Sequence, residues 1–239
     1  VEEYGDVILG SSSDSTTTHE INLLAGGKNN AGIYISGSNA QVTTDGMTLS
    51  IDGSEQVGTQ IENNGKFYHK NGVITVNGTD NTGIAVKATG YSELSDTAVI
   101  NVKASNLGVY NNETFNMTGG SITADGRAAV GLYSAPSNLT THLSGGTVRS
   151  VNGGIGLYSD KNSVMNLSQG VTLQSGNKGL LFYNYDTLGL AGKYNVNGTV
   201  SAAVENGGNA FYVKNGQNLT SYLTNSFTGS GKLDLTMQS

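Results

Sequence analysis

The feature that most constrains this chain is a short phrase that recurs about every 25 residues. The phrase has three positions: a small residue that is usually glycine, an apolar residue, and a third residue that is usually tyrosine, as in Gly32-Ile33-Tyr34. The first residues of its copies are 51, 25, 23, 25, 23 and 31 positions apart, and the step of 51 equals two periods. Self-similarity at such a period is typical of solenoids, in which each repeat packs on its neighbours. The copies begin at Gly32, Gly83, Gly108, Gly131, Gly156, Gly179 and Ala210.

Two further phrases keep the same period, so each repeat holds three short segments of alternating apolar and polar residues. Asp-Gly or Asn-Gly dipeptides, such as Asn152-Gly153, lie between the segments and let the chain change direction at low cost. Hairpins closed by these dipeptides are an alternative, but they do not explain three segments at a fixed period. The pattern predicts an all-β fold, a right-handed parallel β-helix with three strands per coil of about 25 residues and roughly nine coils. No spacing of apolar residues indicates a helix.

We expect residues 1–239 to form a single solenoid, because no linker or shift in composition divides them. Residues 1–25 are expected to form a cap or an irregular lead-in, and residues 226–239 a terminal edge. The last step between copies is long, which predicts an insertion between Asn184 and Val196. One column of inward-facing residues should comprise Ile33, Ile84, Val109, Leu132, Leu157, Leu180 and Phe211.

Composition excludes several classes of protein. The chain has 35 Gly, 27 Asn, 25 Ser and 25 Thr, but a single Pro and no Cys, so disulfides and thiolate metal sites are ruled out. Its net charge is −6 and it contains only two arginines, which excludes the basic stripe that nucleic acid binding requires. No run of 18 apolar residues is present, so the sequence predicts no membrane-spanning helix.

These features resemble the passenger domains of type V autotransporters of Gram-negative bacteria. The resemblance rests on the repeat, the Gly/Asn/Ser/Thr-rich and Cys-free composition, the Gly-Ile-Tyr and Gly-Leu-Tyr phrases, and the segment from Phe227 to Leu233. It implies exposure outside the outer membrane, at the bacterial cell surface or after secretion, with attachment only through a C-terminal barrel that this stretch does not include. Because the chain starts at Val1 without a signal peptide, we interpret it as a piece of a longer processed protein.

The tyrosines of the repeated phrase form the most informative candidate site. Since the residue after the glycine should face inward, alternation sends the tyrosine outward. Stacked exposed tyrosines suit a sugar or a protein partner, and the alternative is a ladder that packs only on itself. We expect Ala85 and Leu181 to interrupt the column. Its predicted members are Tyr34, Tyr110, Tyr133, Tyr158 and Tyr212.

A second candidate is the insertion after the sixth copy, where Tyr183, Tyr185 and Asp186 would lie on a projecting loop. The sequence gives little support for a catalytic site, because its acidic residues are few and scattered over different columns. Asp45 and Asp125 are expected to form turns, and Asp160 is expected to lie near the insertion. No cofactor and no metal are predicted. The three histidines are far apart in the repeat and are expected at the surface; they are His19, His69 and His142.

Three interpretations of the function remain. The favoured one is a non-catalytic segment of a surface-displayed adhesin that binds a host-cell glycan or receptor protein. The second is a structural spacer or a self-association segment of the passenger. The third is a β-helical polysaccharide lyase or hydrolase, which would need acidic residues converging in a groove.

Overall fold

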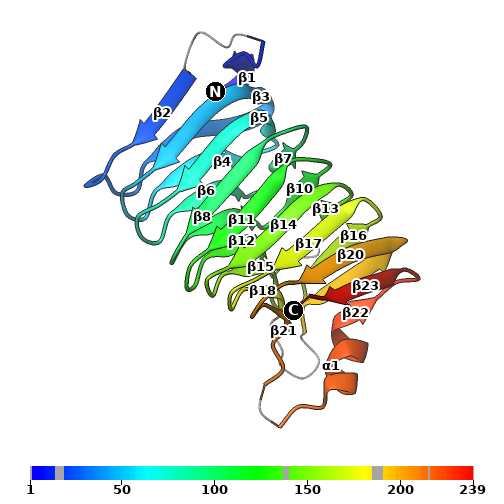
Figure 1. Ribbon diagram of the computed structural model, residues 1–239. Helices are drawn as coiled ribbons and strands as arrows, with labels where there is room; N and C mark the ends of the chain where they lie inside the picture. The colour runs from blue at the N-terminus through cyan, green and yellow to red at the C-terminus, as the bar shows by residue number, and fades with distance from the viewer. Residues whose placement is uncertain (1, 14–18, 137–139, 185–190, 215, 239) are drawn as a thin grey trace.

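The computed structural model describes residues 2–13, 19–136, 140–184, 191–214 and 216–238. It confirms the predicted right-handed parallel β-helix, with 62% of the chain in strands and a repeat of roughly 25 residues (Figure 1). The solenoid has about seven turns rather than the nine expected. The last repeat contains a helix and loops, so chain length divided by the period overestimates the number of regular coils.

One side of the solenoid carries the repeated Gly-Ile-Tyr phrase, and we call it the tyrosine side. Its strands pair in parallel with the equivalent strand one repeat away, such as Leu132 with Leu157. The glycine of the phrase is needed for close approach: a Cβ atom on Gly108 would lie 2.5 Å from the carbonyl oxygen of Gly131. The strands are the start of β3 (Ala31–Ile51), β4 (Val57–Glu62), β6 (Thr82–Val86), β9 (Leu107–Asn111), β12 (Val130–Ser134), β15 (Ile155–Ser159), β18 (Leu180–Asn184) and β21 (Asn209–Phe211).

The second side follows directly in each coil and corresponds to the weakest of the three sequence phrases. Its buried positions include Phe67, Phe115 and Met165, so large side chains fill the core from this side. The strands are β1 (Glu2–Leu9), the middle of β3, the start of β5 (Lys66–Val76), β7 (Tyr91–Leu94), β10 (Thr114–Met117), β13 (Thr140–Leu143), β16 (Val164–Ser168), β19 (Lys193–Asn197) and β22 (Phe227–Thr228).

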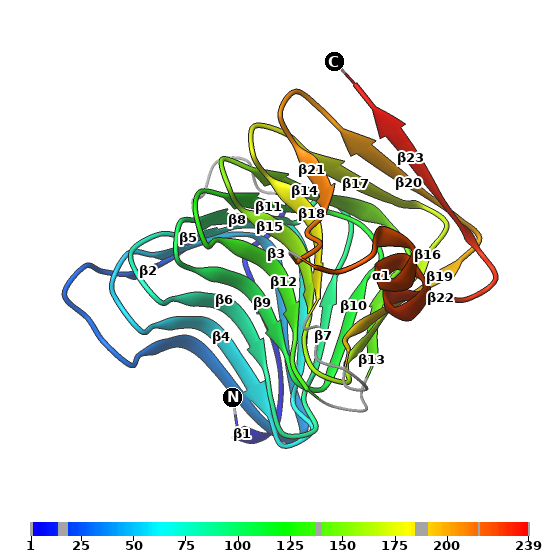
Figure 2. The same cartoon turned by 90° about the horizontal axis from the view of Figure 1, so that it is seen from below.

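The third side closes the coil, and Figure 2 shows how the three sides enclose the core. Its inward column contains Leu49, Ile74, Ile100, Ile122 and Val148, all at most 1% exposed. The strands are β2 (His19–Leu23), the ends of β3 and β5, β8 (Val99–Lys103), β11 (Ser121–Asp125), β14 (Gly146–Val151), β17 (Val171–Ser175), β20 (Thr199–Val204) and β23 (Lys232–Met237).

The register corrects one member of the predicted core column. Leu157 pairs with Phe182, whereas Leu180 pairs with Ile155 and lies partly exposed on the outer face. Gly179 closes the preceding turn, where its amide donates to the carbonyl of Gly176. The phrase of this coil is therefore displaced by two residues from Gly179-Leu180-Leu181. The observed column is Ile33, Thr59, Ile84, Val109, Leu132, Leu157, Phe182 and Phe211.

The turns between the third side and the tyrosine side contain a buried amide ladder that the sequence analysis missed. The Asn81 side chain accepts from the Gln56 amide at 2.8 Å and donates to the carbonyls of Gly53 and Asn77 at 2.8 and 2.6 Å. Asn106 repeats the arrangement one coil later and accepts from the Asn81 amide at 2.9 Å. These bonds satisfy backbone groups that a tight buried turn would leave unpaired.

The two ends of the solenoid differ from its middle. Strands β1 and β2, within the segment expected as a cap or lead-in, both pair in parallel with β3. Near the other end, helix α1 (Leu219–Ser226) was not expected; Asn218 caps it by accepting from two backbone amides. It lies beside β19 and β22 and buries Tyr222 (Figure 2). Among the described residues, no helix has the length and apolar character needed to cross a membrane.

Candidate binding site

The tyrosine side gathers most of the predicted tyrosines into one packed ladder. The rings of Tyr110 and Tyr133 are stacked with centroids 5.6 Å apart, and Tyr133 meets Tyr158 edge to face at 4.9 Å. Tyr183 continues the column in edge-to-face contact with Tyr158 at 4.8 Å and stacks on Tyr212 at 5.8 Å. The ladder therefore runs through five successive coils.

Two of the sequence expectations about this column need correction. Leu181 does not interrupt it, because Tyr183 occupies the outer position of that coil and pairs with Tyr158. Tyr183 consequently lies on strand β18 and not on the projecting loop. The other two residues of the loop candidate, Tyr185 and Asp186, lie outside the described residues.

Packing within the ladder limits what its members can offer a ligand. The rings of Tyr133, Tyr158 and Tyr183 each meet a ring on both neighbouring coils. Aromatic pairs of this kind stabilise the fold, and they give every inner ring an aromatic neighbour on both sides along the column. The predicted alternative of a ladder that packs on itself thus describes the inner members.

Hydroxyl groups on this side are held by carboxylates from neighbouring coils. The Tyr133 hydroxyl donates to Asp160, and burial together with this carboxylate raises the pKa of Tyr133. The Tyr34 hydroxyl donates to Glu62 in the same way. Asp160, which the sequence placed near the insertion, therefore has a partner within the ladder.

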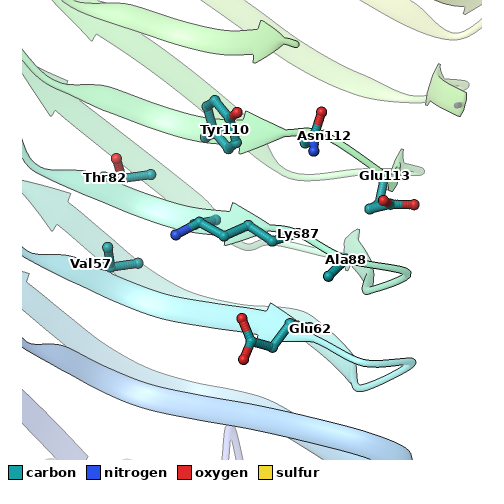
Figure 3. Close-up of a pocket in the computed structure, with 9 residues that line it drawn as sticks. Val57, Glu62, Thr82, Lys87, Ala88, Tyr110, Asn112 and Glu113 are labelled. Carbon is teal, nitrogen blue, oxygen red and sulfur yellow. The ribbon is translucent and has the colours of Figure 1, made fainter. Parts of the chain in front are cut away.

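A gap in the column creates a hollow. Tyr34 is separated from the ladder because the two intervening outer positions hold Gln60 and Ala85. Without two rings, an open cavity of about 660 Å³ forms beside Tyr110, the first ring of the ladder (Figure 3). Among the described residues, no other ring packs on the Ala85 side of Tyr110. The hollow is lined by Val57, Glu62, Thr82, Ala85, Lys87, Ala88, Tyr110, Asn112 and Glu113.

The hollow combines an aromatic wall with hydrogen-bonding groups of both kinds. In Figure 3 the Lys87 side chain runs back along β6, between Tyr110 on β9 and Glu62 on β4. Its ammonium donates to Gln60 Oε1 at 3.4 Å, and Gln60 Nε2 donates to Glu62 at 3.2 Å. Glu62 also accepts from Tyr34, so the polar edge is preorganised. Such a site can stack on an apolar ring face and hydrogen-bond the hydroxyls around it.

Two acidic residues that were expected to form turns lie in strands instead, Asp45 within β3 and Asp125 at the end of β11, and each is bonded to neighbouring coils. Asp125 accepts from Lys103 at 2.7 Å and from Asn152 at 2.6 Å, and these bonds lower the pKa of its carboxyl. Asp45 accepts from Asn71 at 2.7 Å, which lowers its pKa likewise. In the described part of the chain, no three His, Asp or Glu side chains gather closely enough to hold a metal ion.

One of the histidine expectations is wrong. His69 is fully buried on the second side, where its Nδ1 lies 2.6 Å from Thr44 Oγ1 and its ring stacks beside Phe67. Burial lowers the pKa of His69 to about 4, so the ring is neutral at physiological pH. His19 and His142 are partly exposed, and the His142 ring nitrogen Nε2 lies 3.0 Å from Ser168 Oγ.

Comparisons of the chain with protein-family models, with curated proteins and with solved structures gave no match. The candidate site therefore rests on the ladder and on the hollow beside it.

Proposed function

We propose that this chain is a non-catalytic segment of a bacterial surface adhesin of the autotransporter type, and that it binds a glycan on the host-cell surface. The observation that carries the proposal is the hollow of about 660 Å³ beside Tyr110. The resemblance of the repeat and composition to autotransporter passengers supports display outside the cell. The β-helix supplies a rigid rod on which such a site is held in a fixed geometry.

The chemistry of the hollow favours a sugar ring over other ligands. A pyranose has an apolar face of C–H groups that can lie against Tyr110, and hydroxyls around its rim that need donors and acceptors. Lys87 and Asn112 supply donors, while Glu62 and Glu113 supply acceptors. A purely apolar ligand would displace water from these polar groups without offering them hydrogen bonds, which is costly.

The same geometry argues against hydrolysis as the primary role. Glu62 and Glu113 both face the hollow, so a two-carboxylate mechanism has to be considered. However, Glu62 accepts hydrogen bonds from Tyr34 and Gln60, which leaves this carboxylate fewer free lone pairs for a reacting sugar. The segment should therefore release no reducing sugar from polysaccharides, and steady release would contradict the proposal.

The test is binding of the purified segment to host cells before and after glycosidase treatment. Wild type should bind intact cells and lose binding once surface glycans are removed. Ala85→Tyr should also abolish binding, because the new ring continues the ladder and fills the hollow. Thr123→Tyr, which adds the same side chain to the third side, serves as the matched control and should bind normally.

Other outcomes of this binding assay would lead to different conclusions about the ligand and the site. Binding that survives glycosidase treatment would replace the glycan by a receptor protein and contradict the proposal. Absence of binding to every cell type would favour the structural spacer. If Ala85→Tyr and Thr123→Tyr both lost binding, an added tyrosine would disturb the surface wherever it is placed. The hollow would then not be the binding site that this experiment demonstrates.

A further inference from the structure

A second hollow lies at the other end of the tyrosine ladder. Its volume is about 420 Å³, and it adjoins Tyr212, whose side chain is 52% exposed and stacks on Tyr183. The residues that line it are Gly153, Ile155, Lys178, Leu180, Tyr183, Asn209, Phe211 and Tyr212. The ladder therefore has a hollow at each end, at the two places where a terminal tyrosine is available.

The two hollows share a tyrosine, a lysine and an asparagine, whereas the glutamates of the first have no acidic counterpart in the second. Each contains a terminal tyrosine of the ladder, one lysine and one asparagine, which are Tyr110, Lys87 and Asn112 in the first hollow. The counterparts in the second are Tyr212, Lys178 and Asn209. Similar groups at both ends indicate ligand units of similar chemistry.

A column of apolar residues runs between the hollows beside the tyrosine ladder, and one of its members, Val130, is buried at 7% exposure. The outer position three residues before each tyrosine holds Leu107, Val130, Ile155 and Leu180 in successive coils. The first hollow takes Val57 and Thr82 from the continuation of this column, and the second takes Ile155 and Leu180 from it, so both lie on the same line along the solenoid axis. Four coil steps separate Ala85 from Tyr183, which is about 19 Å at the spacing of paired strands.

We infer that the ligand is a linear, uncharged oligosaccharide that lies along the solenoid axis and places one sugar in each hollow. This inference rests on the proposed function and adds the length, direction and charge of the ligand. A separation of about 19 Å exceeds the reach of a disaccharide and lies within that of a hexasaccharide.

Charge on this face disfavours a polyanionic glycan. Three carboxylates, Glu62, Glu113 and Asp160, lie along the path against two lysines, Lys87 and Lys178. The chain as a whole carries a net charge of −6. Sulfated or sialylated chains would be repelled along this path, whereas an uncharged chain meets no such penalty.

The experiment uses glycans released from the cells that bind the segment, separated by charge and by length, as competitors of cell binding. Uncharged fractions of six to eight sugars should inhibit at concentrations at least about tenfold lower than fractions of two or three, because linked contacts reinforce one another. Tyr212→Ala dismantles the second hollow and leaves the first in place, so this variant should still bind cells but lose most of this length dependence. Thr123→Tyr should leave it intact.

Equal inhibition by short and long fractions would overturn the inference while leaving the proposed glycan-binding function in place. The inference also fails if Tyr212→Ala keeps the full length dependence, or if anionic fractions inhibit best. If no fraction inhibits and cell binding is insensitive to glycosidase, the proposed function falls together with the inference.

Discussion

At the scale of single residues, the position of a tyrosine in its column and the side chains on the neighbouring coils decide what its ring can contact. Tyr110 and Tyr158 come from copies of the same phrase and occupy equivalent outer positions. Tyr158 meets a ring edge to face on both neighbouring coils, whereas Tyr110 meets one ring and borders the hollow beside Ala85. The absence of an aromatic ring at one position thus matters as much as its presence at the others.

The variant that fills the gap tests whether the position accepts a ring. Ala85 is only 2% exposed, so a new ring must displace the side chains that cover it, and packing on Tyr110 should offset this cost to within about 1 kcal/mol of the free energy of unfolding. Urea denaturation of the variant beside wild type measures the change. A loss of more than about 1 kcal/mol would mean that the position does not accept a ring, and the gap would then be a structural requirement.

The buried histidine predicts a specific dependence of stability on pH. His69 has a pKa of about 4 in the fold, against about 6.5 when the chain is unfolded, so only the unfolded chain takes up a proton between these values. Stability is therefore fully present above pH 6.5 and falls as the pH drops, by about 2–3 kcal/mol between pH 7 and 4.5. The lowered pKa values of Asp45 and Asp125 act at lower pH than this window.

His69→Leu isolates this effect, because the equivalent position in the next coil is Leu94. Urea denaturation at pH 7 and at pH 4.5 should show a much smaller loss for the variant than for wild type. An identical loss in the two proteins would assign the acid sensitivity to other groups.

At the scale of elements, the turns depend on amide side chains that satisfy buried backbone groups. Asn81→Ala removes one accepted and two donated hydrogen bonds and should cost about 2–3 kcal/mol. Asn77→Ala is the matched control: its side chain makes an exposed bond to Asp52, and its loss should stay within about 0.5 kcal/mol. Similar losses in both variants would contradict a special role for the buried ladder.

The strands show how far the sequence could predict the structure. The period and the three alternating segments are sufficient for the parallel β-helix, because only stacked coils use such a repeat. The register of β18 was mispredicted because Gly179-Leu180-Leu181 imitates the phrase, and only strand pairing shows that the outer tyrosine is Tyr183. Burial of His69 was missed because histidine is a polar residue, and only strand pairing shows that it stands in an inward-facing column that is otherwise largely apolar.

At the scale of the whole molecule, the candidate site is a property of the stack and belongs to no single coil. Sequence alone predicts outward-facing tyrosines and even the interruption at Ala85. It could not show that the rings cover one another, or that the interruption produces a hollow edged by Glu62 and Lys87. Those features depend on side-chain directions across neighbouring coils, which a repeat pattern does not contain.

The proposed ligand contacts the tyrosine ladder at the gap beside Tyr110. The most direct measurement is an NMR titration of the segment with ¹³C-labelled tyrosine rings, using the unfractionated glycans released from host cells. The ring signals of Tyr110 should shift, while those of Tyr194, which is fully buried in the core, should remain nearly unchanged. Shifts confined to rings away from the hollow, or the same shifts in Ala85→Tyr as in wild type, would contradict the claim.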